Sequence, residues 1–159
     1  MGRINVGRVV VGGLLAGLIV NISEFVLNTY VIGSDMEAAL KAMNAPPMTA
    51  GQIPMFVVLG FLLGIASVWM YAAIRPRYGA GPATAVKAGL AAWFLGGLLN
   101  AAFMWPMGLM PHNLTLISTA VMLVEFPLAA VVGAKFYMES AGMGKGMGAG
   151  AGAGMGSRM

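Results

Sequence analysis

Four long apolar stretches, separated by short polar segments, dominate the pattern of hydrophobic and polar positions along the chain. Crossing about 30 Å of hydrocarbon takes roughly 20 helical residues, and each stretch has that length. The stretches must be helical, because lipid offers no partner for backbone N–H and C=O groups. We therefore predict an all-α integral membrane protein, a bundle of four transmembrane helices over residues 9–32, 53–74, 84–105 and 114–137.

Small and polar residues recur every three or four positions within each stretch, so they share one helix face. In the first stretch this face begins with a GxxxG pair, whose spacing lets a second helix approach closely. We expect the four faces to pack against one another inside the bundle. The predicted helix-packing glycines are Gly13, Gly17, Gly60, Gly64 and Gly96.

Composition supports this assignment. Of 159 residues, 59% are hydrophobic and 9% are charged, whereas a typical soluble domain is about 25% charged. A chain this apolar cannot cover a water-facing surface. It contains no cysteine, which excludes disulfides, thiolate metal sites and cysteine nucleophiles.

The basic residues lie almost entirely on one side of the predicted bundle. Only Lys41, among nine Lys and Arg, falls in the first loop. The positive-inside rule then predicts that both termini and the second loop are cytoplasmic. We expect a multi-pass protein of the cell membrane, similar to small four-span proteins of the prokaryotic inner membrane. The other eight basic residues are Arg3, Arg8, Arg75, Arg77, Lys87, Lys135, Lys145 and Arg158.

The first loop reads SDMEAALKAMNAPP and has helical signals of its own. Ser34 and Glu37 have the spacing of a capping box. Glu37 and Lys41 form an i,i+4 pair in the favourable orientation. We predict a short helix over residues 35–43 that lies on the outer membrane surface.

The end of the chain has a different composition. Gly, Ala and Met dominate residues 140–159, with no period that could build a core. We predict a disordered tail there. The transmembrane domain is then residues 1–139.

Two carboxylates, Glu24 and Glu125, lie inside the first and fourth apolar stretches. No Lys or Arg lies at their depth, and a charged carboxylate in hydrocarbon costs at least about 2.5–3.5 kcal/mol. We therefore expect at least one carboxyl to be protonated at neutral pH. Three amides fall at similar depths, so we predict an intramembrane polar cluster of Asn21, Glu24, Asn28, Asn100 and Glu125.

This cluster has two interpretations that the sequence leaves open. Acids inside a membrane commonly mark proton or cation pathways. Alternatively, Glu and Asn cross-link helices through hydrogen bonds that contribute about 0.6–2 kcal/mol. Pro127 follows Glu125 by two residues and frees a backbone carbonyl beside the acid, which favours a pathway slightly.

A methionine-rich segment, MWPMGLMPH, follows the third stretch. It contains Met104, Met107, Met110 and His112, and it resembles the methionine motifs of copper transport proteins in spacing only. The first loop adds Met43 and Met48, with Met55 nearby, on the same predicted side of the membrane. Thioethers are soft ligands that suit Cu(I). Methionine is also a flexible apolar filler, and 15 of the 159 residues are Met. We therefore predict no bound metal or other cofactor, and keep Cu(I) handling as an alternative.

The sequence carries no catalytic signature, because HExxH, GxSxG, Walker A and GxGxxG motifs are all missing. We expect a non-enzymatic protein that acts by helix–helix contact in the lipid bilayer, as an accessory or assembly subunit of another membrane protein or as a homo-oligomer. Its cations do not cluster into a face that would bind nucleic acid. The alternative is a small proton- or cation-coupled transporter or channel that uses Glu24 and Glu125.

Overall fold

The computed structural model describes residues 3–46 and 49–137, and this part of the chain is helical with no strand. The all-α class and the number of long apolar helices that the sequence predicts are therefore confirmed for these residues. The predicted tail over residues 140–159 lies outside them. The helices long and apolar enough to cross a membrane are Val6–Val31, Gln52–Tyr78, Pro82–Met107 and His112–Ala134.

The first long helix changes its winding near its end. It consists of α1 (Val6–Val26) and η1, a π-helical turn over Leu27–Val31. The Asn5 side chain caps α1 by accepting a hydrogen bond from the Arg8 backbone nitrogen at 3.2 Å. A π-helical turn places one extra residue in the helix and so rotates the face that follows it.

The short helix α2 (Gly33–Ala42) overlaps the helix predicted over residues 35–43. Its start differs from the prediction, because the N-cap is Ile32 and no side chain caps it. The capping box of Ser34 and Glu37 is therefore wrong. The chain arrives from η1 with Ile32 already in a helical conformation (φ −116°, ψ −2°), so no extended capping residue is needed.

The third long helix is less regular than the single span that the sequence predicts. It runs through α4 (Pro82–Trp93), a π-helical turn η2 (Phe94–Leu98), α5 (Leu99–Met104) and a 3₁₀ turn η3 (Trp105–Met107). Gly108 then turns the chain with a φ of +62°, a conformation that favours glycine.

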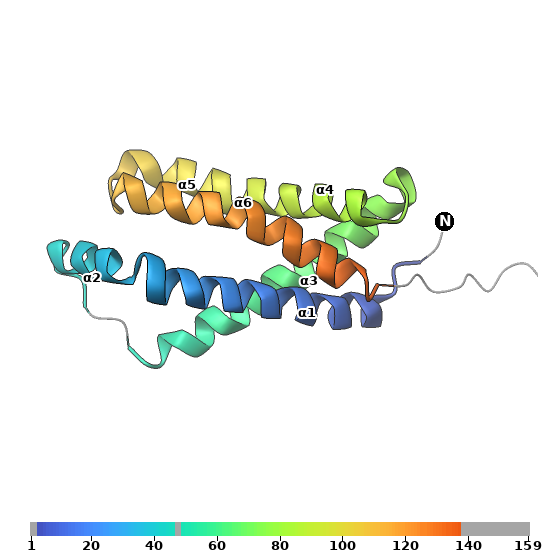
Figure 1. Ribbon diagram of the computed structural model, residues 1–159, viewed down its shortest axis with the longest axis horizontal. Helices are drawn as coiled ribbons and strands as arrows, with labels where there is room; N and C mark the ends of the chain where they lie inside the picture. Colours follow the sequence, from blue (N-terminus) through green and yellow to red (C-terminus); the bar gives the residue numbers. More distant parts are fainter. Residues whose placement is uncertain (1–2, 47–48, 138–159) are drawn as a thin grey trace, which may run out of the picture.

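The long helices form two antiparallel pairs (Figure 1). α1 packs along α3 (Gln52–Tyr78), and α4 packs along α6 (His112–Ala134). Contacts of α1 with α6 and of α3 with α4 join the two pairs into a bundle.

The two ends of the bundle differ in charge. At one end the Asn5 backbone nitrogen donates to the Tyr137 hydroxyl at 3.5 Å, so the start of α1 and the end of α6 lie together. The end of α3 carries Arg75 and Arg77, and the Arg75 guanidinium lies 5.6 Å from the Tyr137 ring centre. We call this the basic end and the opposite one, which carries α2, the α2 end (Figure 1).

Glycines let the backbones of α1 and α3 touch. A methyl group on Gly13 would lie 2.5 Å from the Ile65 Cα atom, and one on Gly17 would lie 2.6 Å from the Phe61 Cα atom. We call such a line of close backbone contact between two helices a seam. From the α3 side of the α1–α3 seam, a methyl group on Gly64 would collide with the backbone of Gly17. No larger residue fits at these positions without moving the helices apart.

Two further seams hold α6 in place. A methyl group on Gly12 of α1 would lie 2.5 Å from the Gly133 carbonyl oxygen of α6. A methyl group on Gly89 of α4 would lie 2.6 Å from the Phe126 carbonyl oxygen. Of the predicted packing glycines, Gly96 lies outside these seams: it is exposed, and its nearest neighbour would be the Phe126 ring at 3.7 Å.

Replacing Gly64 with alanine should destabilise the bundle, because the added methyl group has no space between α1 and α3. Overpacking of this kind costs about 1–3 kcal/mol. Thermal unfolding of the detergent-solubilised protein, followed by circular dichroism, measures the change. Gly7→Ala is the matched control, because Gly7 is exposed on α1 and an added methyl group there would lie no closer than 3.6 Å to the Asn5 side chain, so the melting temperature should stay unchanged. Equal melting temperatures for the two variants would contradict the close contact of α1 with α3 at Gly64.

Candidate functional site

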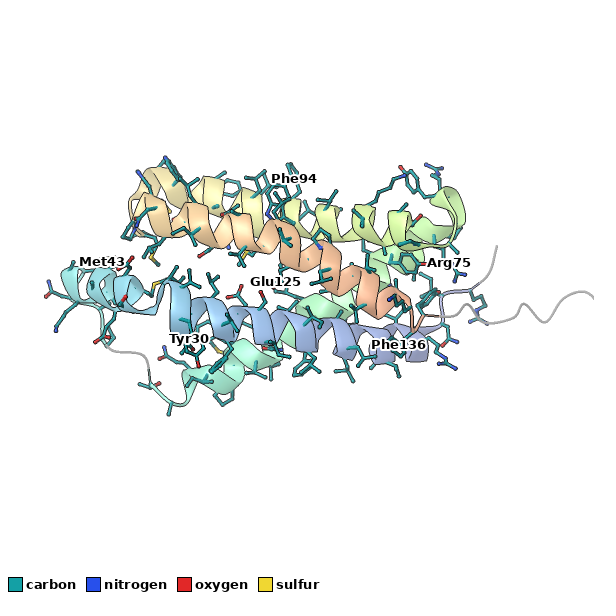
Figure 2. The ribbon with its side chains drawn as sticks, in the orientation of Figure 1. Tyr30, Met43, Arg75, Phe94, Glu125 and Phe136 are labelled. Carbon is teal, nitrogen blue, oxygen red and sulfur yellow. The ribbon has the colours of Figure 1, made fainter. Side chains whose placement is uncertain are left out.

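Glu125 of α6 is the most deeply buried ionisable group in the interior of the bundle. It is 3% exposed, and both carboxyl oxygens are buried without a hydrogen-bond partner among the described residues. Figure 2 shows its side chain in the region between α6 and α1. Two polar groups of α1, the Ser23 hydroxyl and the Glu24 carboxyl, lie close enough to interact electrostatically with Glu125. The Ser23 hydroxyl does not reach hydrogen-bond geometry.

Glu24 is half-buried and is only partly satisfied. Its Oε2 atom accepts a hydrogen bond from the Asn28 side-chain nitrogen at 2.9 Å, while its Oε1 atom is buried with no hydrogen-bond partner in the described part of the chain. The same Asn28 nitrogen donates to the Glu24 backbone oxygen at 2.8 Å. Asn28 lies in η1 and is exposed. The polar groups therefore continue from the buried pair toward the α2 end.

Apolar layers enclose the two acids, one helical turn away on each side. Toward the basic end, Val20 and Ala129 belong to the main apolar cluster of the bundle. Toward the α2 end, Leu27 and Val121 belong to a smaller cluster. The carboxyls are thus held in a low-dielectric layer, where the electrostatic interaction between them is stronger than in water.

The described Lys and Arg side chains do not balance the negative charge that the Glu24–Glu125 pair would carry. The described Lys and Arg residues sit at the ends of the helices or on α2, as Arg75 and Lys41 illustrate. Neither carboxyl forms an ion pair with any of them, and neither Glu125 oxygen has a hydrogen-bond partner within residues 3–46 and 49–137. A net negative charge in this layer would therefore have no counter-charge from the described residues.

Both helices are irregular next to the acids. The π-helical turn η1 begins three residues after Glu24. On the other side of the pair, Pro127 lies inside α6 and leaves the Leu123 carbonyl without its helical hydrogen bond. π-helical turns and proline kinks are common where helices carry a functional site or bend.

The structure brings together only part of the predicted polar cluster. Glu24, Asn28 and Glu125 lie at one site, and Ser23 joins them. Sequence reasoning missed Ser23, although it sits beside Glu24 on the face that turns toward α6. Asn21 points elsewhere: its side-chain nitrogen donates to the Gly17 and Val57 oxygens at 2.8 and 3.2 Å and so joins α1 to α3.

Asn100 does not reach the acids. It is exposed on α5 and has no hydrogen bond to the described part of the chain. The prediction assumed an uninterrupted helix, whereas the π-helical turn η2 precedes Asn100. One extra residue in a helix of 3.6 residues per turn rotates everything after it by about 100°.

The comparisons with known proteins place the chain in no family. No family model matches it, and no curated protein or solved structure is significantly similar to it. Within residues 3–46 and 49–137, no group of three His, Cys, Asp or Glu side chains is arranged to hold a metal ion. The function must therefore be argued from the geometry of the site itself.

Glu125→Leu should keep the melting temperature at neutral pH unchanged or raise it. The substitution breaks no hydrogen bond among the described residues and removes the cost of burying a carboxyl group. Asn21→Ala is the matched comparison, because it removes two hydrogen bonds and should lower stability by about 0.6–2 kcal/mol. A larger loss for Glu125→Leu than for Asn21→Ala would make Glu125 a structural cross-link.

Proposed function

We propose that this is a multi-pass protein of the cell membrane that binds and releases protons at the Glu24–Glu125 pair, as a small proton-conducting channel or transporter. The observation that carries the proposal is the burial of Glu125, 3% exposed with neither oxygen hydrogen-bonded to a described residue. Buried polar groups that serve packing are nearly always hydrogen-bonded. Acidic residues inside a membrane are rare, and they commonly mark ion or proton pathways.

The surface of the bundle supports a position in the bilayer. Large apolar side chains are exposed along all four long helices, including Leu18, Leu62, Leu95 and Val124. With basic residues at one end and Lys41 at the other, the positive-inside rule places the basic end in the cytoplasm. The α2 end then faces outward.

The Glu24–Glu125 pair is suited to bind one exchangeable proton. Two adjacent carboxylates without a counter-charge would repel each other strongly in a low-dielectric layer. A single proton held between Glu24 and Glu125 removes half of the charge and supplies a hydrogen-bond donor. Glu24 is half-buried and lies next to the exposed Asn28, so the pair exchanges protons with solvent from the α2 end.

For a proton to pass from the Glu24–Glu125 pair to the basic end, the helix packing on that side must open. The Gly12–Gly133 backbone contact and the main apolar cluster lie on that side of the acids. Opening this contact would expose the pair to the cytoplasmic side, as alternating access requires. The irregular helix beside Pro127 is the part of α6 that bends most easily.

Proteoliposomes test this function directly. We expect vesicles containing the unmodified protein to take up protons down a pH gradient, when valinomycin balances charge and an enclosed pH-sensitive dye reports the flux. Glu125→Gln and Glu24→Gln should reduce the flux at least about tenfold, because an amide cannot exchange a carboxyl proton.

Glu37→Gln is the control, since Glu37 is an exposed acid on α2 outside the pair. Its flux should equal that of the unmodified protein. Unmodified protein without flux, or Glu125→Gln with full flux, would refute the proposal.

A second candidate function, self-association through the third long helix, rests on a different observation. Gly96 and Asn100 are exposed four residues apart, and Phe103 beside them is 70% exposed. An amide that faces hydrocarbon without a partner is unfavourable. The same face of a second copy offers a complementary amide, with both donor and acceptor. This supports a homo-oligomer.

The other glycine faces do not support partner contact in the same way. Most of the glycines that the sequence predicts as contact surfaces already pack within the chain, between α1 and α3. They are Gly13, Gly17, Gly60 and Gly64. Only the face with Gly96 stays open among the predicted packing glycines. A homo-oligomer should therefore form through α5 and η2.

Asn100→Leu should weaken such an oligomer by roughly 3–30-fold, the equivalent of about 0.6–2 kcal/mol for the lost hydrogen bonds. Energy transfer between labelled copies in vesicles, measured at increasing dilution in lipid, gives the dissociation constant. Leu62→Ala, on the exposed face of α3, is the control and should have no effect. A dissociation constant that Asn100→Leu leaves unaltered would exclude this face.

A further inference from the structure

A cavity of about 350 Å³ opens at the α2 end, between the last turn of α2 and the segment that leads into α6. Figure 2 labels Met43 on the α2 side of this region. The cavity joins parts of the chain that are about 65 residues apart in the sequence. Its lining residues are Ala39, Ala42, Met43, Gly108, Leu109, Met110, Pro111 and His112.

Three of these residues carry soft donor atoms: the thioether sulfurs of Met43 and Met110 and the imidazole of His112. The rest of the lining is Ala, Gly, Leu and Pro, so no carboxylate or thiol side chain belongs to it. Mg²⁺ and Ca²⁺ require several oxygen ligands. Two thioethers and an imidazole instead suit a soft monovalent ion such as Cu(I).

The fold selects among the methionines that the sequence groups together. Met104 and Met107 do not line the cavity. Of the methionines that the sequence places in or near the first loop, Met43 lines the cavity together with Met110 and His112. The tertiary structure thus changes which side chains could act together as ligands.

The ring of His112 is held in one orientation. It stacks on Trp105 with ring centres 3.9 Å apart and planes at 5°. Its Nε2 atom lies 3.4 Å from the Trp105 carbonyl oxygen. With the proton on Nε2, this contact leaves the lone pair of Nδ1 available to a metal. Such a hydrogen bond on the far nitrogen orients many metal-binding histidines.

The end of α2 adds a favourable electrostatic potential. Ala39 and Ala42 belong to its last turn, and Met43 is its C-cap. Carbonyl groups at a helix C-terminus carry a partial negative charge that attracts cations. A positive ion in the cavity would lie beside this end of a ten-residue helix.

We propose that Met43, Met110 and His112 form a binding site for one Cu(I) ion at the α2 end. This site is separate from the Glu24–Glu125 pair and does not depend on proton transport. Two thioether sulfurs and one imidazole nitrogen give three-coordinate ligation, and no change in oxidation state is involved.

Ag(I), which has the ligand preference of Cu(I) and resists oxidation, is the first probe. We expect the detergent-solubilised full chain, in a chloride-free buffer, to bind one Ag(I) ion at this site. Protein labelled with carbon-13 on the methionine methyl groups reports binding by NMR. The resonances of Met43 and Met110 should shift until one equivalent is added, and Cu(I) kept reduced with ascorbate should reproduce these shifts.

Met43→Leu, Met110→Leu and His112→Phe should each weaken this binding at least about tenfold, as expected when a metal loses a ligand. The phenylalanine keeps a ring to stack on Trp105 but has no nitrogen. Met104→Leu and Met107→Leu are the matched controls and should change the dissociation constant less than about twofold, since neither side chain lines the cavity.

Three results would overturn the site. They are unshifted Met43 and Met110 resonances at one equivalent of Ag(I), equal loss of binding in Met104→Leu or Met107→Leu, and undiminished affinity in Met110→Leu. The NMR shifts are read on the unmodified protein, so a variant that fails to fold does not prevent the test.

Discussion

Direct backbone contact between helices is the constraint on which this structure depends. The α1–α3 seam closes at Gly13, Gly17 and Gly64, and the α1–α6 seam closes where Gly12 meets Gly133. Helix association in lipid gains little from burying apolar surface, so close packing has to hold the bundle together. The second seam matters most for the site, because it holds α6 against α1 and so brings Glu125 opposite Glu24.

The acids lie where this close contact ends. α1 and α6 diverge toward the α2 end (Figure 1), and larger side chains such as Leu27 and Leu114 occupy the wider part of the interface. Between the glycine contact and these larger residues is a layer that contains both carboxyls, where the charge of Glu24 acts on Glu125. A buried carboxyl group without a hydrogen-bond partner is costly when charged, so this layer is compatible with a stable fold when the pair carries a proton.

The proposed proton site and the proposed copper site use different physical means. The carboxyl pair depends on isolation from solvent and on the lack of a counter-charge from the described residues. The site at the α2 end depends on the direction of donor atoms, which the stacking of His112 on Trp105 and the end of α2 provide. Both lie on the α2 side of the main apolar cluster. An ion that arrives from that side therefore meets the soft donors before the acids.

The sequence by itself determined the four apolar helices, the short helix near residues 35–43 and the presence of acids inside the bundle. These features follow from apolar length and from the repeat of 3.6 residues, which are local properties. Only the tertiary structure decided which polar residues meet. A stripe fixes one face of a helix but not its neighbour, so Asn21 turned to α3 while Glu24 turned to α6. The π-helical turn η2 rotated Asn100 outward, and contact between distant segments placed Met43 beside His112.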